Sequence, residues 1–353
     1  MKKIFIAATS QNDGKTTVSL GLISIFQESF KKVAFIKPIG QRYLEEDGLK
    51  IDEDSILIEE VCGIRCGLKD MSPIAVEKGF TEKYISRPDK NLISKQIKDS
   101  YRRVSKNQDL TIIEGTGHAG VGSVMDHSNA TVARLLGSKV IIISSGGIGR
   151  PIDEIVLNKA LFEKEGVKVL GVIVNKVLPD KFDKINRLVR LGLKRKGIDV
   201  LGVLPYHPLL SRPTIEQILE ETDFELLCGK DYVEKYISSV IVGAMQPDDA
   251  VKYIVEDGLV ITPGDREDII SRALKVKISG VILTGGMTPE SSIMEALKKA
   301  DIPVLLAKQD TYMVATAVHD MTVKIRPQDT TKINTVIKMI KDNVAIDKIL
   351  KGM

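Results

Sequence analysis

The chain has 353 residues, of which 43% are hydrophobic, 28% charged and 5% aromatic, with no Trp. This composition is typical of a globular protein with two domains, and it gives little support to aromatic stacking on single-stranded nucleic acid. The net charge of +4 is the small difference between 51 basic and 47 acidic residues, and the basic residues are scattered, so we expect no nucleic-acid partner.

The lack of a recognisable targeting signal and the small number of cysteines indicate a cytoplasmic protein. The apolar N-terminal run is short, no segment is long enough to span a bilayer, and three cysteines make no disulfide framework. Cys62 and Cys66 have a Cys-x₃-Cys spacing without a second ligand pair, which favours ordinary thiols over a zinc site. We therefore expect no signal peptide, no membrane partner and a reducing location.

The N-terminal segment predicts a phosphate-binding P-loop. An apolar run at residues 4–8 is followed by Thr-Ser-Gln-Asn-Asp-Gly-Lys-Thr-Thr at Thr9–Thr17 and then by a helix-like segment. A buried strand, a tight loop ending in Gly-Lys-Thr and a helix are the context that a P-loop needs. The loop N–H groups would bind phosphates, Lys15 would reach the outer phosphates, and the Thr16 hydroxyl would bind Mg²⁺. The alternative is a surface turn that happens to contain Gly-Lys-Thr.

Further apolar runs predict buried strands that alternate with helices. The predicted strands are residues 32–36, 110–114, 140–143, 169–174 and 200–205. This alternation predicts right-handed crossovers and an α/β fold with a largely parallel sheet and helices on both faces. Because the carboxyl ends of such strands form the ligand edge of the sheet, one site could collect Lys15, Lys37, Glu114 and Asn175.

Two acids are candidate Mg²⁺ ligands. Glu114 ends a core strand and precedes Gly-Thr-Gly, as expected of a carboxylate that holds Mg²⁺ directly or through water beside a P-loop. The acidic stretch Glu45–Asp54 is predicted to be mostly solvated loop. Asp54 stands next to a predicted helix start and could also reach the metal.

Several motifs occur in a fixed order over about residues 1–210. They are Thr9-x₄-Gly14-Lys15-Thr16, Lys37-Pro38-Ile39, Asp54, Glu114-Gly115-x-Gly117, Val174-Asn175 and Leu201-Gly202-x-Leu204-Pro205. This order resembles dethiobiotin synthetase and its P-loop relatives, including the N-terminal domain of long phosphotransacetylases. The resemblance implies ATP and Mg²⁺ as cofactors.

The resemblance also implies roles for individual residues. Thr16, Asp54 and Glu114 would hold Mg²⁺. Lys15 and Lys37 would contact phosphates and act as the catalytic lysines, and Asn175 would read adenine. The implied nucleotide-binding set is Thr9, Asp13, Gly14, Lys15, Thr16, Thr17, Asn175 and Pro205.

Closely spaced prolines after Pro205 predict a domain boundary, which gives a P-loop domain at 1–210, a second domain at 211–330 and a C-terminal helix at 331–353. Thr214-x-x-Gln217 predicts a capping box that opens a short helix. The second domain then repeats the α/β alternation, and the C-terminal helix could pack on either domain or on a partner. The predicted elements of the second domain are strands at 240–242, 259–261, 281–283 and 304–306 and helices near 248–255 and 267–274.

Asp265-Arg266 and Thr284-Gly285-Gly286 each follow a predicted strand of the second domain. These two strand-end loops resemble the DRTGG domain, which follows the P-loop domain in long phosphotransacetylases. They could bind an anionic effector. They could equally be a structural ion pair and a tight turn.

Three functions follow from these patterns. The first is a Mg-ATP-binding sensor or regulator whose DRTGG domain binds a small-molecule effector or mediates homodimerisation. The second is an ATP-dependent ligase of the dethiobiotin synthetase or cobyrinic acid diamide synthase type, which phosphorylates a carboxylate or carbamate. The third is a scaffold that binds no nucleotide. Acetyl transfer is not expected, because the sequence ends without the catalytic domain of a phosphotransacetylase, and Cys228 lacks the surroundings of a glutaminase nucleophile.

Overall fold

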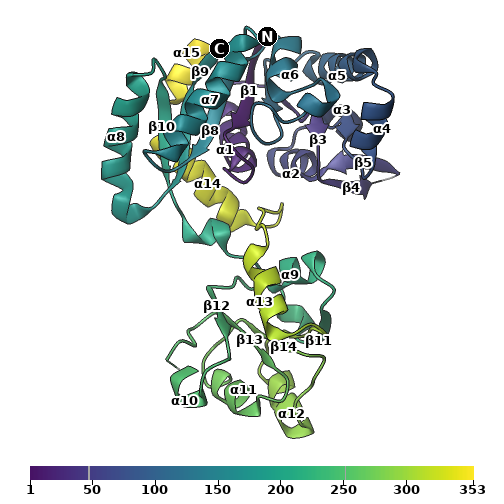
Figure 1. Cartoon of the computed structure of the whole chain (residues 1–353), viewed down its shortest axis with the longest axis vertical. Helices are drawn as coiled ribbons and strands as arrows, with labels where there is room; N and C mark the ends of the chain where they lie inside the picture. The colour runs from purple at the N-terminus through teal and green to yellow at the C-terminus, as the bar shows by residue number, and fades with distance from the viewer. Residues whose placement is uncertain (47, 251) are drawn as a thin grey trace. The chain divides into compact units, whose positions relative to one another are not determined.

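The computed structural model describes residues 1–46, 48–250 and 252–353 (Figure 1). The chain divides into unit 1, residues 1–207 and 325–353, and unit 2, residues 208–324. Asp47 of the predicted acidic loop and Val251 of the predicted helix near Asp248 lie outside the described residues. None of the helices in the described part has the length and apolar character that crossing a bilayer requires.

Unit 1 is built on a sheet of parallel strands in the order β10-β9-β8-β1-β7-β2. The strands are β1 (Lys2–Ala8), β2 (Val33–Ile36), β7 (Leu110–Glu114), β8 (Lys139–Ser145), β9 (Val169–Val177) and β10 (Val200–Pro205). Their side chains are almost all buried because helices cover both faces, which is the usual reason why parallel strands read as continuous apolar runs. The predicted α/β fold is therefore confirmed.

The helices of unit 1 follow the strands along the chain. They are α1 (Lys15–Phe26), α2 (Glu53–Cys62), α3 (Leu68–Met71), α4 (Phe80–Ser86), α5 (Lys90–Ser105), α6 (Asn129–Leu135), α7 (Arg150–Lys164), α8 (Phe182–Lys194), α14 (Thr330–Asn343) and α15 (Ile346–Gly352).

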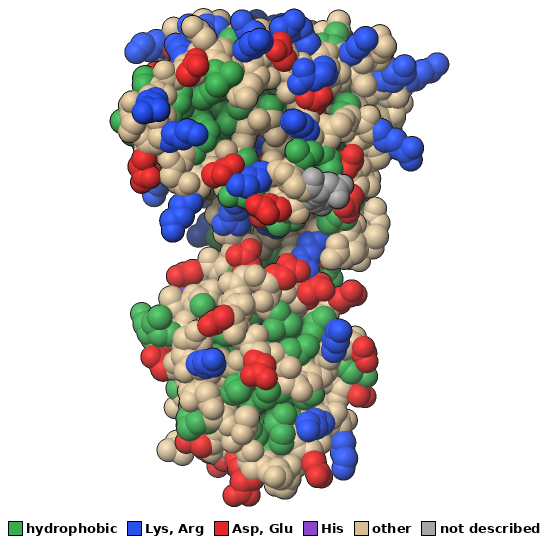
Figure 2. Space-filling model, turned by 90° about the vertical axis from the view of Figure 1, so that its right-hand side faces the viewer, with side chains coloured by type: hydrophobic (Ala, Val, Ile, Leu, Met, Phe, Trp, Pro, Cys, Tyr) green, Lys and Arg blue, Asp and Glu red, His purple; other side chains and the backbone are tan. Residues whose placement is uncertain are grey.

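Figure 2 shows Lys and Arg side chains interspersed with acidic and apolar ones on the face drawn. This dispersal agrees with the scattered basic residues of the sequence.

The C-terminal segment packs within unit 1, where α14 runs alongside α1 (Figure 1). Gly21 of α1 permits this close approach, because a Cβ at that position would lie 2.5 Å from Ile340 Cγ1. Beyond α14 the chain forms a β-bridge from Val344 to Gly202 of β10. The helical spacing at 331–350 thus belongs to two helices, separated where the backbone pairs with the sheet.

The stretch predicted as a solvated acidic loop is wrong in part, because it contains an antiparallel hairpin of β4 (Tyr43–Glu46) and β5 (Leu49–Asp52). Ile51 and Asp52 of β5 are buried. Glu45 of β4 is the register partner of Lys50 of β5. Gly48 supplies a left-handed turn residue with φ of 75°.

Unit 2 has a sheet of order β11-β15-β14-β13-β12. Strands β12 to β15 are parallel, as predicted, whereas the antiparallel edge strand β11 was not predicted. Successive residues of the central strands alternate between two cores. One core faces α11 (Glu267–Ala273) and α12 (Ser291–Lys299), and the other faces α9 (Ile215–Glu221) and α13 (Thr311–Asp320). The strands are β11 (Glu225–Cys228), β12 (Ser239–Val242), β13 (Gly258–Pro263), β14 (Gly280–Thr284) and β15 (Val304–Leu306).

The helices of unit 2 include α9, whose predicted capping box is confirmed. Thr214 Oγ1 accepts from Gln217 N at 3.2 Å, and Gln217 Oε1 accepts from Thr214 N at 3.1 Å. The helix predicted near 248–255 is shorter than expected. The helices are α9 (Ile215–Glu221), α10 (Pro247–Ala250), α11 (Glu267–Ala273), α12 (Ser291–Lys299) and α13 (Thr311–Asp320).

Candidate functional site

The predicted P-loop connects β1 to α1 at the carboxyl edge of the unit 1 sheet. Gly14 has a left-handed backbone with φ of 93°, and a Cβ there would lie 2.3 Å from Asn175 Nδ2. Only glycine fits this position without strain. Among the described residues, no side chain caps the N-terminus of α1. The free N–H groups and the positive end of the helix dipole are the features that bind anions.

Asp13 lies inside the loop and is 5% exposed. Its Oδ2 accepts from Thr9 Oγ1 at 2.8 Å and from Ser10 N at 2.7 Å, and its Oδ1 accepts from Ser145 Oγ at 2.5 Å. The Asp13 carbonyl accepts from Asn175 Nδ2 at 2.9 Å. Residues at the ends of β1, β8 and β9 therefore meet at one loop residue.

Lys15 and Thr16 begin α1. The Lys15 ammonium folds back onto the loop, where it lies 3.3 Å from Ser10 O, and burial lowers its pKa. Thr16 Oγ1 donates to Glu114 Oε1 at 3.0 Å. Thr17 follows in the same helical turn, and the loop thus contacts the acid that ends β7.

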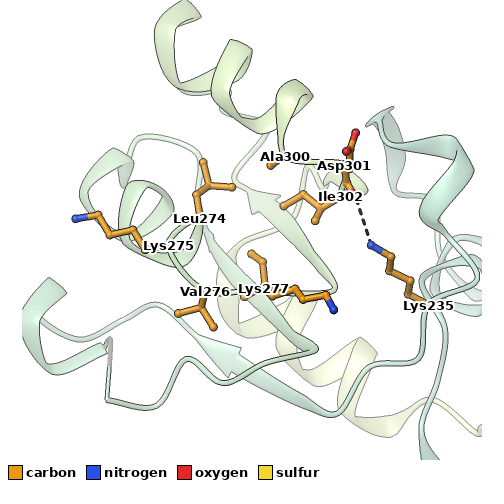
Figure 3. Close-up of a pocket in the computed structure, with 9 residues that line it drawn as sticks. Lys235, Leu274, Lys275, Val276, Lys277, Ala300, Asp301 and Ile302 are labelled. Carbon is orange, nitrogen blue, oxygen red and sulfur yellow. Dashed lines mark hydrogen bonds between the residues drawn. The ribbon is translucent and has the colours of Figure 1, made fainter.

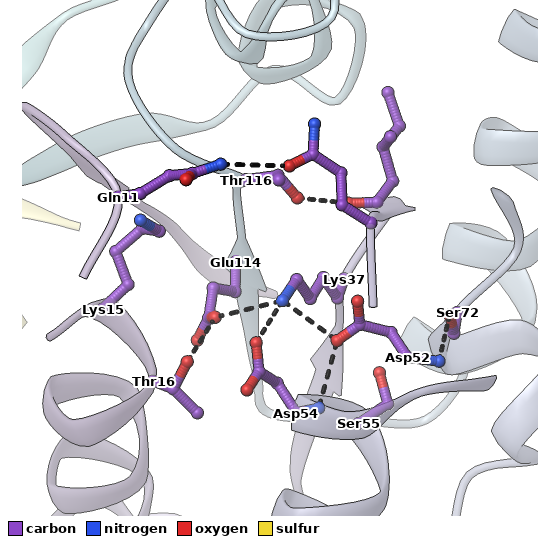
Figure 4. Close-up of polar contacts among 12 residues, drawn as sticks. Gln11, Lys15, Thr16, Lys37, Asp52, Asp54, Ser55, Ser72, Glu114 and Thr116 are labelled. Atoms are coloured by element: carbon purple, nitrogen blue, oxygen red, sulfur yellow. Dashed lines mark hydrogen bonds and ion pairs between the residues drawn. The ribbon is translucent and has the colours of Figure 1, made fainter. Parts of the chain in front are cut away.

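Lys37 follows β2 and sits among three carboxylates, as Figure 4 shows. Its Nζ contacts Asp54 Oδ2, lies 2.9 Å from Asp52 Oδ1 and lies 3.9 Å from Glu114 Oε1. The structure thus brings Lys37, Asp54, Glu114 and Thr16 together, as predicted, although Lys37 points at the acids. We refer to Lys37, Asp52, Asp54 and Glu114 as the acid cluster.

The acid cluster has one ammonium group for three carboxylates. Burial and the charge of Asp54 raise the pKa of Glu114 to about 7, against the opposing effect of Lys37. Burial also raises the pKa of Asp52. Burial by itself would lower the pKa of Lys37, but Asp54, Asp52 and Glu114 together raise it. The lysine therefore stays charged, and the cluster as a whole favours an additional cation.

Two carboxylate oxygens of the acid cluster have no hydrogen-bond partner among the described residues, namely Glu114 Oε2 and Asp52 Oδ2. Buried acceptors left in this way are satisfied by a cation or by water. Within the described part of the chain, no three His, Cys, Asp or Glu side chains are spaced to hold a metal by themselves. The donor set fits Mg²⁺, which takes oxygen ligands and usually binds one or two carboxylates together with phosphates.

Three residues of this site were not predicted. Asp52 caps α2, because its Oδ1 accepts from Asp54 N at 3.0 Å. An Asp immediately before a helix start is a recognisable capping signal. Ser145 and Lys176 are the others, and Lys176 Nζ donates to Asn12 O at 2.6 Å. No sequence pattern predicts the contact of Ser145 with the Asp13 carboxylate or that of Lys176 with a backbone carbonyl.

Asn175 and Pro205 lie at the carboxyl ends of neighbouring strands, β9 and β10. The Asn175 amide is used within the protein, since Nδ2 donates to Asp13 O and Oδ1 accepts from Lys176 N at 2.9 Å. Pro205 pairs in the sheet with Val177. Base recognition by Asn175 and nucleotide contact by Pro205 stay predictions.

In unit 2, Arg266 forms an ion pair with Asp268 at 3.0 Å, not with its neighbour Asp265, and donates to Met245 O at 3.0 Å. Thr284 Oγ1 lies 2.7 Å from Thr311 Oγ1. Gly285 and Gly286 form a turn with φ of 77° and 65°. The tight turn of the structural alternative is present, whereas the ion pair of Arg266 involves Asp268 and not Asp265. Effector binding stays a prediction.

Unit 2 also contains a cavity of about 420 Å³, shown in Figure 3. It lies between residues 274–278, which follow α11, and residues 300–302, which precede β15, at the amino-terminal edge of the sheet. Lys235 Nζ donates across its rim to Asp301 O at 3.3 Å. The cavity is therefore at the sheet edge opposite to the loops of Asp265 and Gly285.

Comparison with known proteins gives two family matches, residues 2–214 to the AAA domain and residues 217–321 to the DRTGG domain. The chain is 26% identical over 357 residues to a phosphate acetyltransferase of Nitratidesulfovibrio vulgaris, covering 97% of this chain and 50% of that protein. It therefore spans about half the length of the curated relatives that it matches along its whole length. It is also 28% identical over 186 residues to an ATP-dependent dethiobiotin synthetase of Clostridium kluyveri, covering 51% of this chain and 77% of that protein.

A solved structure of the CBS and DRTGG domains of a Clostridium perfringens pyrophosphatase is also similar, at 18% identity and a TM-score of 0.29. The match covers 47% of this chain and 86% of that chain. This TM-score is too low to carry a functional conclusion. The sequence matches confirm the predicted resemblance to dethiobiotin synthetase, phosphotransacetylases and the DRTGG domain.

Proposed function

The chain belongs to the AAA domain family through residues 2–214, and from that premise we propose that unit 1 binds Mg-ATP and that the protein is a nucleotide-dependent regulator. The observation that carries the proposal is the acid cluster beside the uncapped N-terminus of α1. A helix N-terminus binds phosphate, and a neighbouring group of oxygen ligands binds its counter-ion. Together these two features suit a polyphosphate with its bound cation.

Each group has a distinct role in this proposal. The loop N–H groups and Lys15 bind the phosphates, and Thr17 lies in the same first turn. Thr16, Asp54 and Glu114 hold Mg²⁺, which when bound neutralises phosphate charge. Lys37 keeps the acids together and is the second lysine of the site.

The regulatory part of the proposal rests on unit 2. Its DRTGG domain would bind an anionic effector near Asp265 and Gly285 or join two copies of the chain into a homodimer. We propose a cytoplasmic location for the same protein. A phosphate acetyltransferase is similar to this chain over 97% of the chain's length, and we propose that the chain is related to the N-terminal half of such proteins without assigning acetyl transfer to it.

A second candidate is an ATP-dependent ligase that phosphorylates a carboxylate or carbamate. The similarity to dethiobiotin synthetase and the pair Lys15 and Lys37 favour it, because two lysines can stabilise the charge of a transferred phosphoryl group. Phosphate release from Mg-ATP, measured with and without a low-molecular-weight cell extract, separates the two candidates. Strong stimulation by the extract supports the ligase, whereas binding without turnover supports the regulator.

Nucleotide binding itself is tested by calorimetric titration of the full chain with Mg-ATP. Lys15→Ala removes a charged contact worth about 1.5–3 kcal/mol and is expected to weaken binding about 10- to 100-fold. The matched control is Lys95→Ala, at an exposed position on α5. Equal affinity of Lys15→Ala and the unmodified protein would refute the nucleotide assignment.

A further inference from the structure

Asp13 places a carboxylate inside a loop that is proposed to bind anions. We infer that Asp13 is a positioning residue, which with Ser145, Asn175 and Lys176 holds the P-loop in its binding shape before a nucleotide arrives. We call these four residues the loop clamp. The inference rests on the proposed nucleotide function, because it explains how the loop of that site keeps its shape.

The carboxylate of Asp13 faces protein donors on both of its oxygens. Oδ2 accepts from the Thr9 hydroxyl and the Ser10 N–H, and Oδ1 accepts from the Ser145 hydroxyl at the end of β8. These contacts join both ends of the loop to a neighbouring strand. Because a carboxylate repels phosphate, its benefit to an anion site must come from the loop geometry that it fixes and not from contact with the ligand.

The backbone of the loop is also held by β9, the neighbour of β8 in the sheet. Asn175 Nδ2 donates to the carbonyl of Asp13, and Lys176 Nζ donates to the carbonyl of Asn12 at 2.6 Å. With two carbonyls turned toward β9, the loop has a defined direction for its peptide groups. Contacts from β8 and β9 thus act on adjacent residues of the same turn.

The loop contains backbone conformations that need such support. Asn12 has φ of 62° and Gly14 has φ of 93°, both in the left-handed region. Few residues other than glycine adopt this region without local hydrogen bonds. A loop released from the clamp would sample other conformations, and its N–H groups would no longer converge on one point.

The test compares three variants of the full chain. Asp13→Ala removes all three side-chain contacts of Asp13. Asp13→Asn retains an acceptor oxygen for Thr9 and Ser10, and its amide N–H can donate to the Ser145 hydroxyl. This variant is therefore expected to keep most of the loop order and ATP affinity that Asp13→Ala loses. The matched control, Asp70→Ala, removes another Asp of unit 1 that accepts from Ser100 Oγ at 3.1 Å and from Arg103 at 2.8 and 2.7 Å.

Two readouts are needed, the amide hydrogen exchange of residues 9–17 without nucleotide and the Kd for Mg-ATP. We expect Asp13→Ala to speed loop exchange at least tenfold and to raise Kd about 10- to 100-fold, with Asp13→Asn within about threefold of the unmodified protein on both. Asp70→Ala is expected to leave both readouts unchanged. If Asp13→Ala does not fold, Ser145→Ala removes one contact and is expected to raise both values about threefold or more.

The outcomes separate the inference from the function on which it rests. Unchanged loop exchange and unchanged Kd in Asp13→Ala would overturn the inference. Equal losses of ATP affinity and of exchange protection in Asp13→Ala and Asp13→Asn would also overturn it, because the charge would then matter and not the hydrogen bonds. If the unmodified protein binds no Mg-ATP, the proposed function fails, and the exchange data alone decide whether the clamp orders the loop.

Discussion

Replacing Lys37 with Met removes the ammonium from the acid cluster and leaves Asp52, Asp54 and Glu114 together. At an effective dielectric constant of about 20, unit charges attract by about 6 kcal/mol at the 2.9 Å between Lys37 and Asp52 and by about 4 kcal/mol at the 3.9 Å to Glu114. The desolvation of the buried lysine, which the variant avoids, offsets much of this attraction. We expect a net loss of about 3–5 kcal/mol in the free energy of unfolding of unit 1, which is the usual result of breaking a buried pair.

The loss should depend on pH in a definite direction. The pKa of Glu114 is already raised to about 7 in the folded protein, above its unfolded value, and removing Lys37 raises it further. An acid with a raised folded pKa loses stability as pH rises from its unfolded to its folded pKa. The deficit of Lys37→Met should therefore be small near pH 4.5 and largest at pH 8.

The assay is thermal unfolding at pH 4.5 and pH 8 without Mg²⁺. Unfolding is measured by calorimetry so that the transitions of the two units are resolved. For a unit of this size, we expect Tm to fall by about 6–20 °C at pH 8. Lys95→Met, on the exposed face of α5, is the control for loss of a lysine. A Tm shift below about 2 °C, or one that is equal at both pH values, would refute the electrostatic reasoning.

Three further changes test unit 1. Glu114→Gln removes a charge that burial and Asp54 disfavour, so at pH 8 it should stabilise the ligand-free protein by about 1–3 kcal/mol. The same variant should reduce the effect of Mg²⁺ on ATP affinity at least tenfold. Calorimetry with and without EDTA measures both effects, and a lower Tm would contradict the assigned repulsion. Gly14→Ala should abolish Mg-ATP binding, because its φ is 93° and a Cβ has no room, whereas Gly67→Ala, for which the described residues leave open space, should bind normally in the same titration. Gly21→Ala should lower stability by about 1–2 kcal/mol in urea unfolding although alanine is the better helix former, since overpacking against α14 outweighs propensity; a gain in stability would show that the helices can separate freely.

The sequence was sufficient to predict that Lys37 and Glu114 lie at the same edge of the sheet. Lys37 and Glu114 directly follow or end buried strands, and all such positions in a parallel sheet lie on one edge. The sheet order, which makes β2 and β7 neighbours, could not be read from the sequence because nothing local specifies which strands pair. The orientation of Lys37 toward the acids depends on that pairing and on the hairpin that delivers Asp52.

The missed elements have the same explanation. Residues 43–52 look like an acidic loop when only charge is counted, and their hairpin is stabilised by contacts with distant segments, such as Lys50 with Glu77 at 2.7 Å. Strand β11 is short and pairs in antiparallel fashion with β15, a partner far along the chain. Ser145 and Lys176 bind loop atoms that adopt their positions only after the sheet has formed.

Unit 1 is discontinuous, because the chain leaves it at His207 and returns at Ile325. During synthesis, every residue of unit 2 is therefore made before the last segment of unit 1. The face of α1 around Gly21 stays uncovered until α14 emerges, and the bridge from Val344 to β10 also has to wait. Unit 2 can complete its two cores while unit 1 still lacks its last segment, so the unit that begins first along the chain is the last to be completed.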